Sequence, residues 1–151
     1  TFDEEFEKVV SYCAERTNTW INEKIKKEYS LLHKSGYAHS VEVWYNGVLI
    51  GGLYGVSIGS AFFAESMFSK KSNASKLAML AIMARLKSNG YTLFDTQFPS
   101  AHLSTLGGLA VTQEAFICKL RLALKVYANF NNTDQCNDWN KILTLATGIV
   151  V

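Results

Sequence analysis

The feature that most constrains the fold is the dipeptide Asn46-Gly47, which separates two segments of strand character. Asn-Gly between such segments is the strongest short-range signal of a β-hairpin, because both central residues of a type I′ turn need a positive φ. The segment SVEVWY before the turn alternates in polarity, and VLIGGLYGVSI continues after it. A second tight turn at Gly59-Ser60 leads into AFFAESMF. The sequence therefore predicts a three-stranded antiparallel meander over residues 40–68.

Two helices are predicted before this meander. The apolar residues of the first recur at helical spacing and follow early acids: Phe2, Phe6, Val9, Val10 and Cys13. Asn22 is expected to cap the second helix, which stops near Gly36. Its apolar positions are Ile25, Tyr29 and Leu32. A flank of two helices before a meander already favours a mixed helix and sheet domain.

After the meander, Asn73 is expected to cap the helix ASKLAMLAIMARLKS, which Asn89-Gly90 ends. This helix is apolar nearly all round, so it should be buried on more than one side. YTLFDTQ is predicted as a strand parallel to a meander strand, because a helix intervenes. A short helical turn over 102–106, a longer helix over 112–127 and a weak closing segment over 139–151 complete an α+β domain.

Composition excludes several classes of protein. With 151 residues, 48% hydrophobic and 19% charged, the chain is expected to be one globular domain. A formal charge of +2 does not by itself imply nucleic-acid binding, and three cysteines without CxxC spacing favour a reducing, cytoplasmic setting. The segment 48–64 carries no charge, but its four glycines and short length indicate paired strands rather than a membrane span. The start TFDEEFEKVV is acidic and amphipathic, unlike a signal peptide.

Two acids and an amide stand out within apolar strands. Asp95 and Gln97 are two residues apart, a spacing that would place both side chains on one face of a strand, just before the only proline, Pro99. Glu65 lies in the apolar run FFAESMFS, where an unpaired carboxylate would be costly to bury. Two plainer interpretations stay open: an edge strand with Glu65 in water, and an Asp95 that caps the following turn.

Three segments then carry a resemblance to a known family. HSVEVWYNGVLIGGLYGVSIG, FFAESMFSKKSNASKLA and FDTQFPSAHLSTLG closely resemble the leucyl/phenylalanyl-tRNA–protein transferases. The ordered blocks GGLYG, ESMFS, NASK, D-x-Q and LG at fitting spacing make this likeness specific, and it runs from about Phe2 to Leu122. The resemblance implies a GNAT-type (acetyltransferase-like) α+β fold, with residues 1–151 as a single catalytic domain.

The resemblance also implies the activity and its partners. Leucine or phenylalanine would pass from aminoacyl-tRNA to the N-terminal arginine or lysine of an acceptor protein, which in bacteria marks that acceptor for degradation. It implies Asp95, Gln97 and Glu65 as catalytic residues, with no cofactor, no metal and no membrane. An α-amine with a pKa of about 7.7–8.0 needs little base strength. We therefore expect Gln97 to orient the amine and Asp95 to supply charge or a proton relay.

Further residues are expected to bind the substrates. An apolar pocket for the transferred amino acid is assigned to Phe62, Met67, Phe68, Leu77 and Phe94. Lysines around a helix N-terminus are assigned, more weakly, to the tRNA 3′ end: Lys70, Lys71 and Lys76. The alternative for the apolar residues is core packing, and the alternative for the lysines is a solvated surface position. His33, His39 and His102 show no metal-ligand spacing.

The chain departs from the family pattern at three places. It is expected to start after an additional N-terminal domain, Thr96 replaces the middle residue of D-C-Q, and LAVTQEAF replaces a basic stretch close to IPRR. The last change weakens a tRNA-binding role. Two other functions therefore stay open. One is a domain that binds N-terminal peptides without catalysis. The other is an acetyl-CoA-dependent N-acetyltransferase, which would need a glycine-bearing loop where this chain has SKKSNAS.

Overall fold

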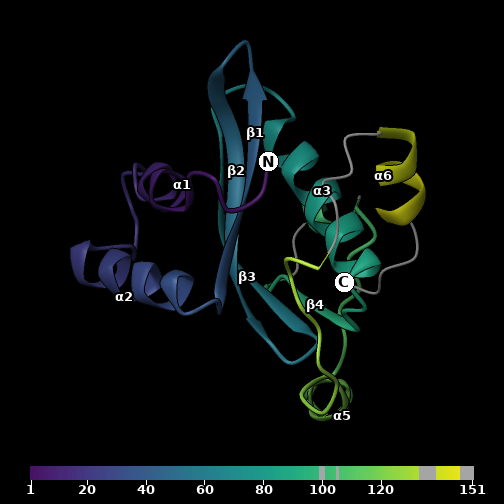
Figure 1. Ribbon diagram of the computed structural model, residues 1–151. Coiled ribbons are helices and arrows are strands. Elements are labelled where there is room, and N and C mark those ends of the chain that lie inside the picture. Colours follow the sequence, from purple (N-terminus) through teal and green to yellow (C-terminus); the bar gives the residue numbers. More distant parts are fainter. Residues whose placement is uncertain (99–100, 105, 133–138, 147–151) are drawn as a thin grey trace. The chain divides into compact units, whose positions relative to one another are not determined.

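The computed structural model describes residues 1–98, 101–104, 106–132 and 139–146, which form an α+β structure with one mixed sheet (Figure 1). The helices are α1 (Phe6–Cys13), α2 (Glu23–Lys34), α3 (Ala74–Ser88), α4 (Ala101–Ser104), α5 (Gln113–Ala123) and α6 (Trp139–Ala146). The strands are β1 (Ala38–Tyr45), β2 (Val48–Ile58), β3 (Ala61–Ser69) and β4 (Leu93–Asp95). Their order in the sheet is β1-β2-β3-β4. The predicted α+β class is confirmed.

The predicted hairpin is confirmed at its turn. Asn46 and Gly47 have φ values of 49° and 74°, the pair of positive angles that a type I′ turn requires. β1 and β2 pair antiparallel, with Tyr45 opposite Val48 next to the turn. β2 and β3 are neighbours joined by two residues, a connection that reverses the chain direction. The three strands therefore form the expected meander.

The chain divides into two compact units. Unit 1 comprises residues 1–56 and 65–79, and unit 2 comprises residues 57–64 and 80–151. In unit 1, α1 and α2 contact each other and both contact β1, as the purple end of the ribbon shows (Figure 1). The core of unit 1 joins apolar residues of α1, β1, β2, the end of β3 and the segment before α2: Phe6, Val9, Val10, Cys13, Ile21, Ala38, Leu49, Tyr54 and Phe68.

The helices of unit 1 begin and end close to the expected residues. α1 begins at Phe6, so the expectation that Phe2 belongs to this helix is wrong: Phe2 forms an isolated antiparallel bridge with Val41 of β1. Asn22 caps α2 as predicted, because its side chain accepts the Ile25 N–H at 3.0 Å. α2 ends at Lys34, shortly before Gly36 with its φ of 78°.

Unit 2 contains the parallel strand pair. β4 pairs parallel with β3, with Phe62 opposite Phe94 and Phe63 opposite Asp95, which confirms the predicted direction of this strand. Phe62 is fully buried, and its ring lies 6.0 Å from Phe94 and 5.8 Å from Phe130. A second cluster joins Ala61, Leu93 and Ala123. β4 ends at Asp95, two residues earlier than expected, so the site residues lie at a strand terminus.

The remaining helices match the expectations in part. α3 has five consecutive buried residues over 82–86, which confirms burial on more than one side, and it ends just before Asn89 and Gly90. α4 covers 101–104 rather than 102–106, and α5 ends at Ala123 rather than near Tyr127. Parts of the predicted loop and closing segment, 133–138 and 147–151, lie outside the described residues. No helix in the described part combines the length and apolar character needed to cross a bilayer.

Candidate functional site

Unit 2 carries a pocket of about 780 Å³ at the end of β4. This volume lies within the usual range for ligand-binding clefts, about 300–1,000 Å³. One wall is formed by residues 93–98, a second by the segment 108–111 and a third by residues of α5, and Leu103 and Ser104 of α4 also line the pocket. The lining is mostly apolar. Asp95 and Lys119 are the ionisable groups among the described lining residues, so the pocket holds one negative and one positive side chain.

Asp95 is the last residue of β4 and is half-buried. Its Oδ1 accepts the backbone N–H of Gln97 at 2.7 Å, which is an Asx turn. Gln97 itself is exposed and has a φ of 67°. The prediction that strand alternation places both side chains on one face is therefore wrong, because the strand ends at Asp95 and the chain then turns. The interpretation that Asp95 caps the following turn is confirmed by this hydrogen bond.

Glu65 belongs to unit 1, where it lies half-buried in β3 beside Tyr29. Burial raises the pKa of Tyr29 above its ordinary value, and the charge of Glu65 and its hydrogen bond with Tyr29 raise this pKa further. The pairs between β3 and β4 cover residues 61–63 and do not reach Glu65. The interpretation that leaves its acid in water is nevertheless wrong, because Glu65 is half-buried and shares a hydrogen bond with Tyr29. Glu65 is instead part of a polar group inside unit 1.

Two buried neighbours complete this group. Tyr54 is fully buried, burial raises its pKa, and its hydroxyl has no hydrogen-bond partner among the described residues. Burial raises the pKa of the Cys13 thiol to about 12, although a hydrogen bond with Ser66 and the charge of Arg16 lower it. Cys13 is therefore protonated at neutral pH and is not a nucleophile. Sequence patterns offer no reason to group these residues with Glu65, because they come from three separate segments.

The residues predicted to hold the transferred amino acid differ in their burial and in the unit to which they belong. Phe94 lines the unit 2 pocket and is also packed against Phe62. Phe68 is 7% exposed and belongs to the core of unit 1, where its ring lies 5.0 Å from Tyr12. Met67 and Leu77 are half-buried in unit 1. Phe62 and Phe68 thus have the packing of core residues.

The three predicted tRNA-binding lysines surround the start of α3. Lys70 Nζ lies 3.0 Å from the centre of the Tyr12 ring and 3.6 Å from a carboxylate oxygen of Glu15. Lys71 Nζ lies 3.9 Å from the Tyr45 ring, and Lys76 is half-buried in the first turn of the helix. The ring contacts place two ammonium groups near the start of α3, and the Glu15 carboxylate partly offsets the charge of Lys70.

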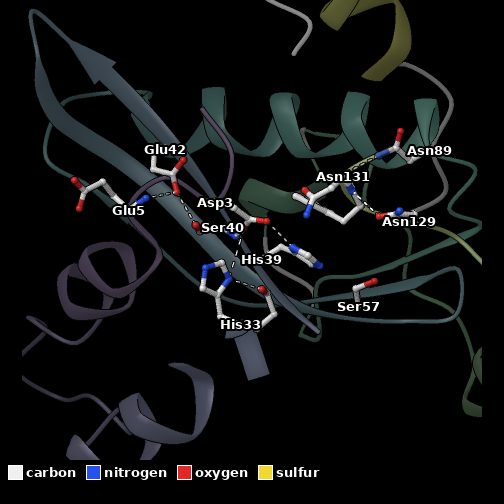
Figure 2. Close-up of polar contacts among 12 residues, drawn as sticks. Asp3, Glu5, His33, His39, Ser40, Glu42, Ser57, Asn89, Asn129 and Asn131 are labelled. Carbon is white, nitrogen blue, oxygen red and sulfur yellow. Dashed lines mark hydrogen bonds and ion pairs between the residues drawn. The ribbon is translucent and has the colours of Figure 1, made fainter. Parts of the chain in front are cut away.

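A polar network in unit 1 was not anticipated (Figure 2). Asp3 accepts the Ser40 N–H at 2.8 Å, and its other carboxylate oxygen lies 2.7 Å from Nδ1 of His39. Glu42 is buried and accepts hydrogen bonds from the hydroxyls of Ser40 and Thr1. The signal that could have found it is the alternation of Ser40 and Glu42 on one face of β1. The network ties residues 1–5 to β1. No group of three or more metal-ligating side chains occurs within the described ranges.

The sequence also did not point to the α5 side of the pocket. Gln113, Phe116 and Lys119 all line it from α5. They are three residues apart, so they share one face of the helix. This spacing is visible in the sequence, but nothing in it shows that this face meets the end of β4.

Comparison with known proteins gives a family match. The family model described as "Leucyl/phenylalanyl-tRNA protein transferase" matches residues 1–121. A leucyl/phenylalanyl-tRNA–protein transferase of Dinoroseobacter shibae is 48% identical over 129 residues, which is 85% of this chain and 58% of the relative. The corresponding protein of Hyphomonas neptunium is 50% identical over 87% of this chain and 52% of its own length.

A third relative extends the match along nearly the whole chain. The leucyl/phenylalanyl-tRNA–protein transferase of Zymomonas mobilis is 43% identical over 149 residues, which is 96% of this chain and 56% of the relative. The chain thus spans little more than half the length of the curated relatives it matches.

Proposed function

The chain belongs to the leucyl/phenylalanyl-tRNA protein transferase family, and we propose on this basis that it carries out aminoacyl transfer. Leucine or phenylalanine passes from aminoacyl-tRNA to the N-terminal arginine or lysine of an acceptor protein, which marks the acceptor for degradation in the cytoplasm. The observation that carries the proposal is the family match over residues 1–121, which includes the acidic strand end that lines the pocket of unit 2.

We also propose that residues 1–151 form one GNAT-type catalytic domain. The order of elements supports this assignment: a meander, a buried helix α3, and a strand β4 that pairs parallel with β3. Two parallel strands need a long crossover connection between them, and here the helix α3 provides it.

The reaction requires an amine nucleophile and an activated ester. The neutral α-amine of the acceptor attacks the ester carbonyl, the new N–C bond forms, and the 3′ oxygen of the tRNA leaves and takes a proton. Because the α-amine has a pKa of about 7.7–8.0, an appreciable fraction is neutral at pH 7 and positioning can supply most of the acceleration. In the proposal, the Asp95 carboxylate attracts the cationic N-terminal residue and helps to relay the proton. Gln97, whose backbone N–H donates a hydrogen bond to Asp95, orients the amine with its side chain.

The remaining assignments concern substrate binding. Glu65 is proposed to contribute a second negative charge toward an N-terminal arginine or lysine, which carries two cationic groups. The apolar residues proposed to hold the leucyl or phenylalanyl side chain are Phe62, Met67, Phe68, Leu77 and Phe94. The residues proposed to contact the tRNA 3′ end are Lys70, Lys71 and Lys76, and the ring contacts of Lys70 and Lys71 hold their charges near the start of α3.

A transfer assay tests the proposal. The full-length natural protein is mixed with phenylalanyl-tRNA and a peptide that starts with arginine, and formation of the Phe-Arg peptide is measured by mass spectrometry. The same peptide with an acetylated N-terminus is the control, because it has no free amine. Product from the free peptide alone is the expected result. Binding of the free peptide without product contradicts the proposal and supports a non-catalytic peptide-binding domain. Acetylation of the peptide in the presence of acetyl-CoA supports an N-acetyltransferase instead.

A further inference from the structure

The unit 2 pocket combines an apolar wall with two opposite charges. Asp95 at the end of β4 and Lys119 on α5 are the ionisable groups among its described lining residues. Lys119 is exposed, and it makes no ion pair within the described parts of the chain. Leu109 and Val111 also line the pocket and expose apolar side chains. An occupant that satisfies this pocket therefore needs a cation for Asp95, an anion for Lys119 and some apolar surface.

The charges favour one of the two substrates of the proposed reaction as that occupant. The 3′ end of a tRNA would bring phosphates, which Asp95 would repel. A peptide brings a positive N-terminal residue for Asp95, and it can bring a carboxylate for Lys119. In an extended peptide each residue adds about 3.3 Å, and a pocket of about 780 Å³ has room for a short segment only. The charge for Lys119 therefore belongs to a residue close behind the first one.

We propose that this pocket binds the segment of the acceptor immediately behind its N-terminal residue, and that Lys119 selects acceptors with an acidic second, third or fourth residue. This inference rests on the proposed function, because it takes the occupant to be the acceptor. Lys119 is a specificity-determining residue here and takes no part in bond making. Because an exposed pair of charges contributes only modestly to binding, exchanging attraction for repulsion changes the dissociation constant by about fivefold.

A peptide-binding series tests the inference. Peptides that start with arginine and carry glutamate, alanine or lysine at one of the next three positions are labelled at their C-termini. Their dissociation constants for the chain are measured by fluorescence anisotropy at low and high salt. The expected result is about fivefold tighter binding of the glutamate peptide than of the lysine peptide for at least one position, with a preference that weakens at high salt.

Charge variants of α5 make the test specific. In Lys119→Glu the preference should reverse, and in Lys119→Gln it should disappear. Arg121→Glu is the matched control, because Arg121 lies on the same helix, does not line the pocket and changes the net charge equally. The proposal is overturned if Lys119→Glu keeps the wild-type preference, if Arg121→Glu changes it equally, or if no peptide binds. The same peptides in the transfer assay separate the two proposals: preference without product contradicts only the proposed function, and product without preference contradicts only this inference.

Discussion

Asp95 combines two tasks that can be separated by substitution. One is structural, because its Oδ1 holds the Gln97 N–H at 2.7 Å, and the other is the negative charge at the pocket. In Asp95→Asn the amide oxygen can still accept the Gln97 N–H, but the charge is lost. We expect kcat/KM for transfer to fall about 100-fold, since proton transfer by a positioned group contributes about 10²–10⁴. The free energy of unfolding, measured by urea denaturation, should change by less than about 0.5 kcal/mol.

Asp95→Ala is the comparison for this prediction. It removes both the charge and the acceptor of the turn hydrogen bond, so it should lose about 1 kcal/mol of stability in addition to activity. If Asp95→Asn is as destabilised as Asp95→Ala and loses activity only in proportion to its unfolding, the carboxylate serves the turn alone.

Cys13 should make stability depend on pH in the alkaline range. Burial raises the pKa of its thiol from 9.0 to about 12 in the folded protein. Above pH 9 the unfolded chain releases this proton while the folded chain keeps it, so the unfolded state is favoured as the pH rises. The thiol's contribution to the free energy of unfolding is complete below pH 9 and is lost between about pH 9 and 12. Over that range the free energy of unfolding falls by about 1.4 kcal/mol per pH unit.

Cys13→Ala is the variant that isolates this effect. It is less stable at every pH because it leaves a small cavity, but its stability should fall less steeply from pH 9 to 11 than that of the parent chain. Urea unfolding at a series of pH values measures the difference. The comparison cancels the contribution of Tyr29, whose pKa burial also raises, but not all of that of Tyr54, because the charge of Cys13 is one cause of the raised Tyr54 pKa. Parallel pH profiles for the two proteins would show that the thiol has no raised pKa.

Among the elements, the connection between β2 and β3 depends on close contact with the end of α5. Gly59 has a φ of 61°, and a Cβ at this position would lie 2.7 Å from the Ala123 oxygen and 2.9 Å from Leu124 Cα. The same oxygen accepts the backbone N–H of Ser60 at 2.9 Å. This turn is therefore fixed both by its own conformation and by the helix beside it.

Gly59→Ala should cost more stability than Gly90→Ala. Both glycines have a positive φ, 61° and 77°, and each substitution should cost about 1–2 kcal/mol for that reason. A Cβ at Gly90 meets no atom within 4 Å, whereas one at Gly59 meets backbone and adds about 1–3 kcal/mol. Thermal or urea unfolding of the two variants provides the measurement. Equal losses would show that α5 does not lie against this turn.

At the scale of the whole molecule, a net charge of +2 gives little general attraction for tRNA. Binding must then depend on where the lysines are placed. If the cluster at the start of α3 contacts phosphates, replacing Lys70, Lys71 and Lys76 by glutamine should lower the slope of log K against log salt concentration by about 0.7–0.9 for each lost contact. Filter binding of aminoacyl-tRNA over a range of KCl concentrations measures that slope.

The control changes the charge by the same amount elsewhere. Lys24, Lys27 and Lys34 are exposed on α2, and their replacement by glutamine also lowers the formal charge by three. We expect the α2 variant to bind tRNA with nearly the parent salt dependence. Equal slopes for both triple variants would mean that net charge, and not the cluster at α3, governs binding.

Features that depend on neighbouring residues could be predicted without a structure. The turn at Asn46-Gly47, the cap at Asn22 and the limits of α3 follow from φ requirements, capping groups and periodicity that act within a few residues. The parallel direction of β4 follows from the intervening helix. Family membership also came from the sequence, because ordered motifs at fixed spacing are visible without any structure.

The form of the site, in contrast, depends on contacts between distant segments, which sequence patterns do not reveal. Alternation predicted a shared face for Asp95 and Gln97, yet the strand ends at Asp95 and the Asx turn redirects Gln97. Phe116 and Lys119 line the same pocket from a helix that is distant in the sequence. Local patterns fix which face of an element is apolar, but they do not fix which other element covers that face. The pocket forms where α5 packs near the end of β4, and only long-range packing determines that these two elements meet.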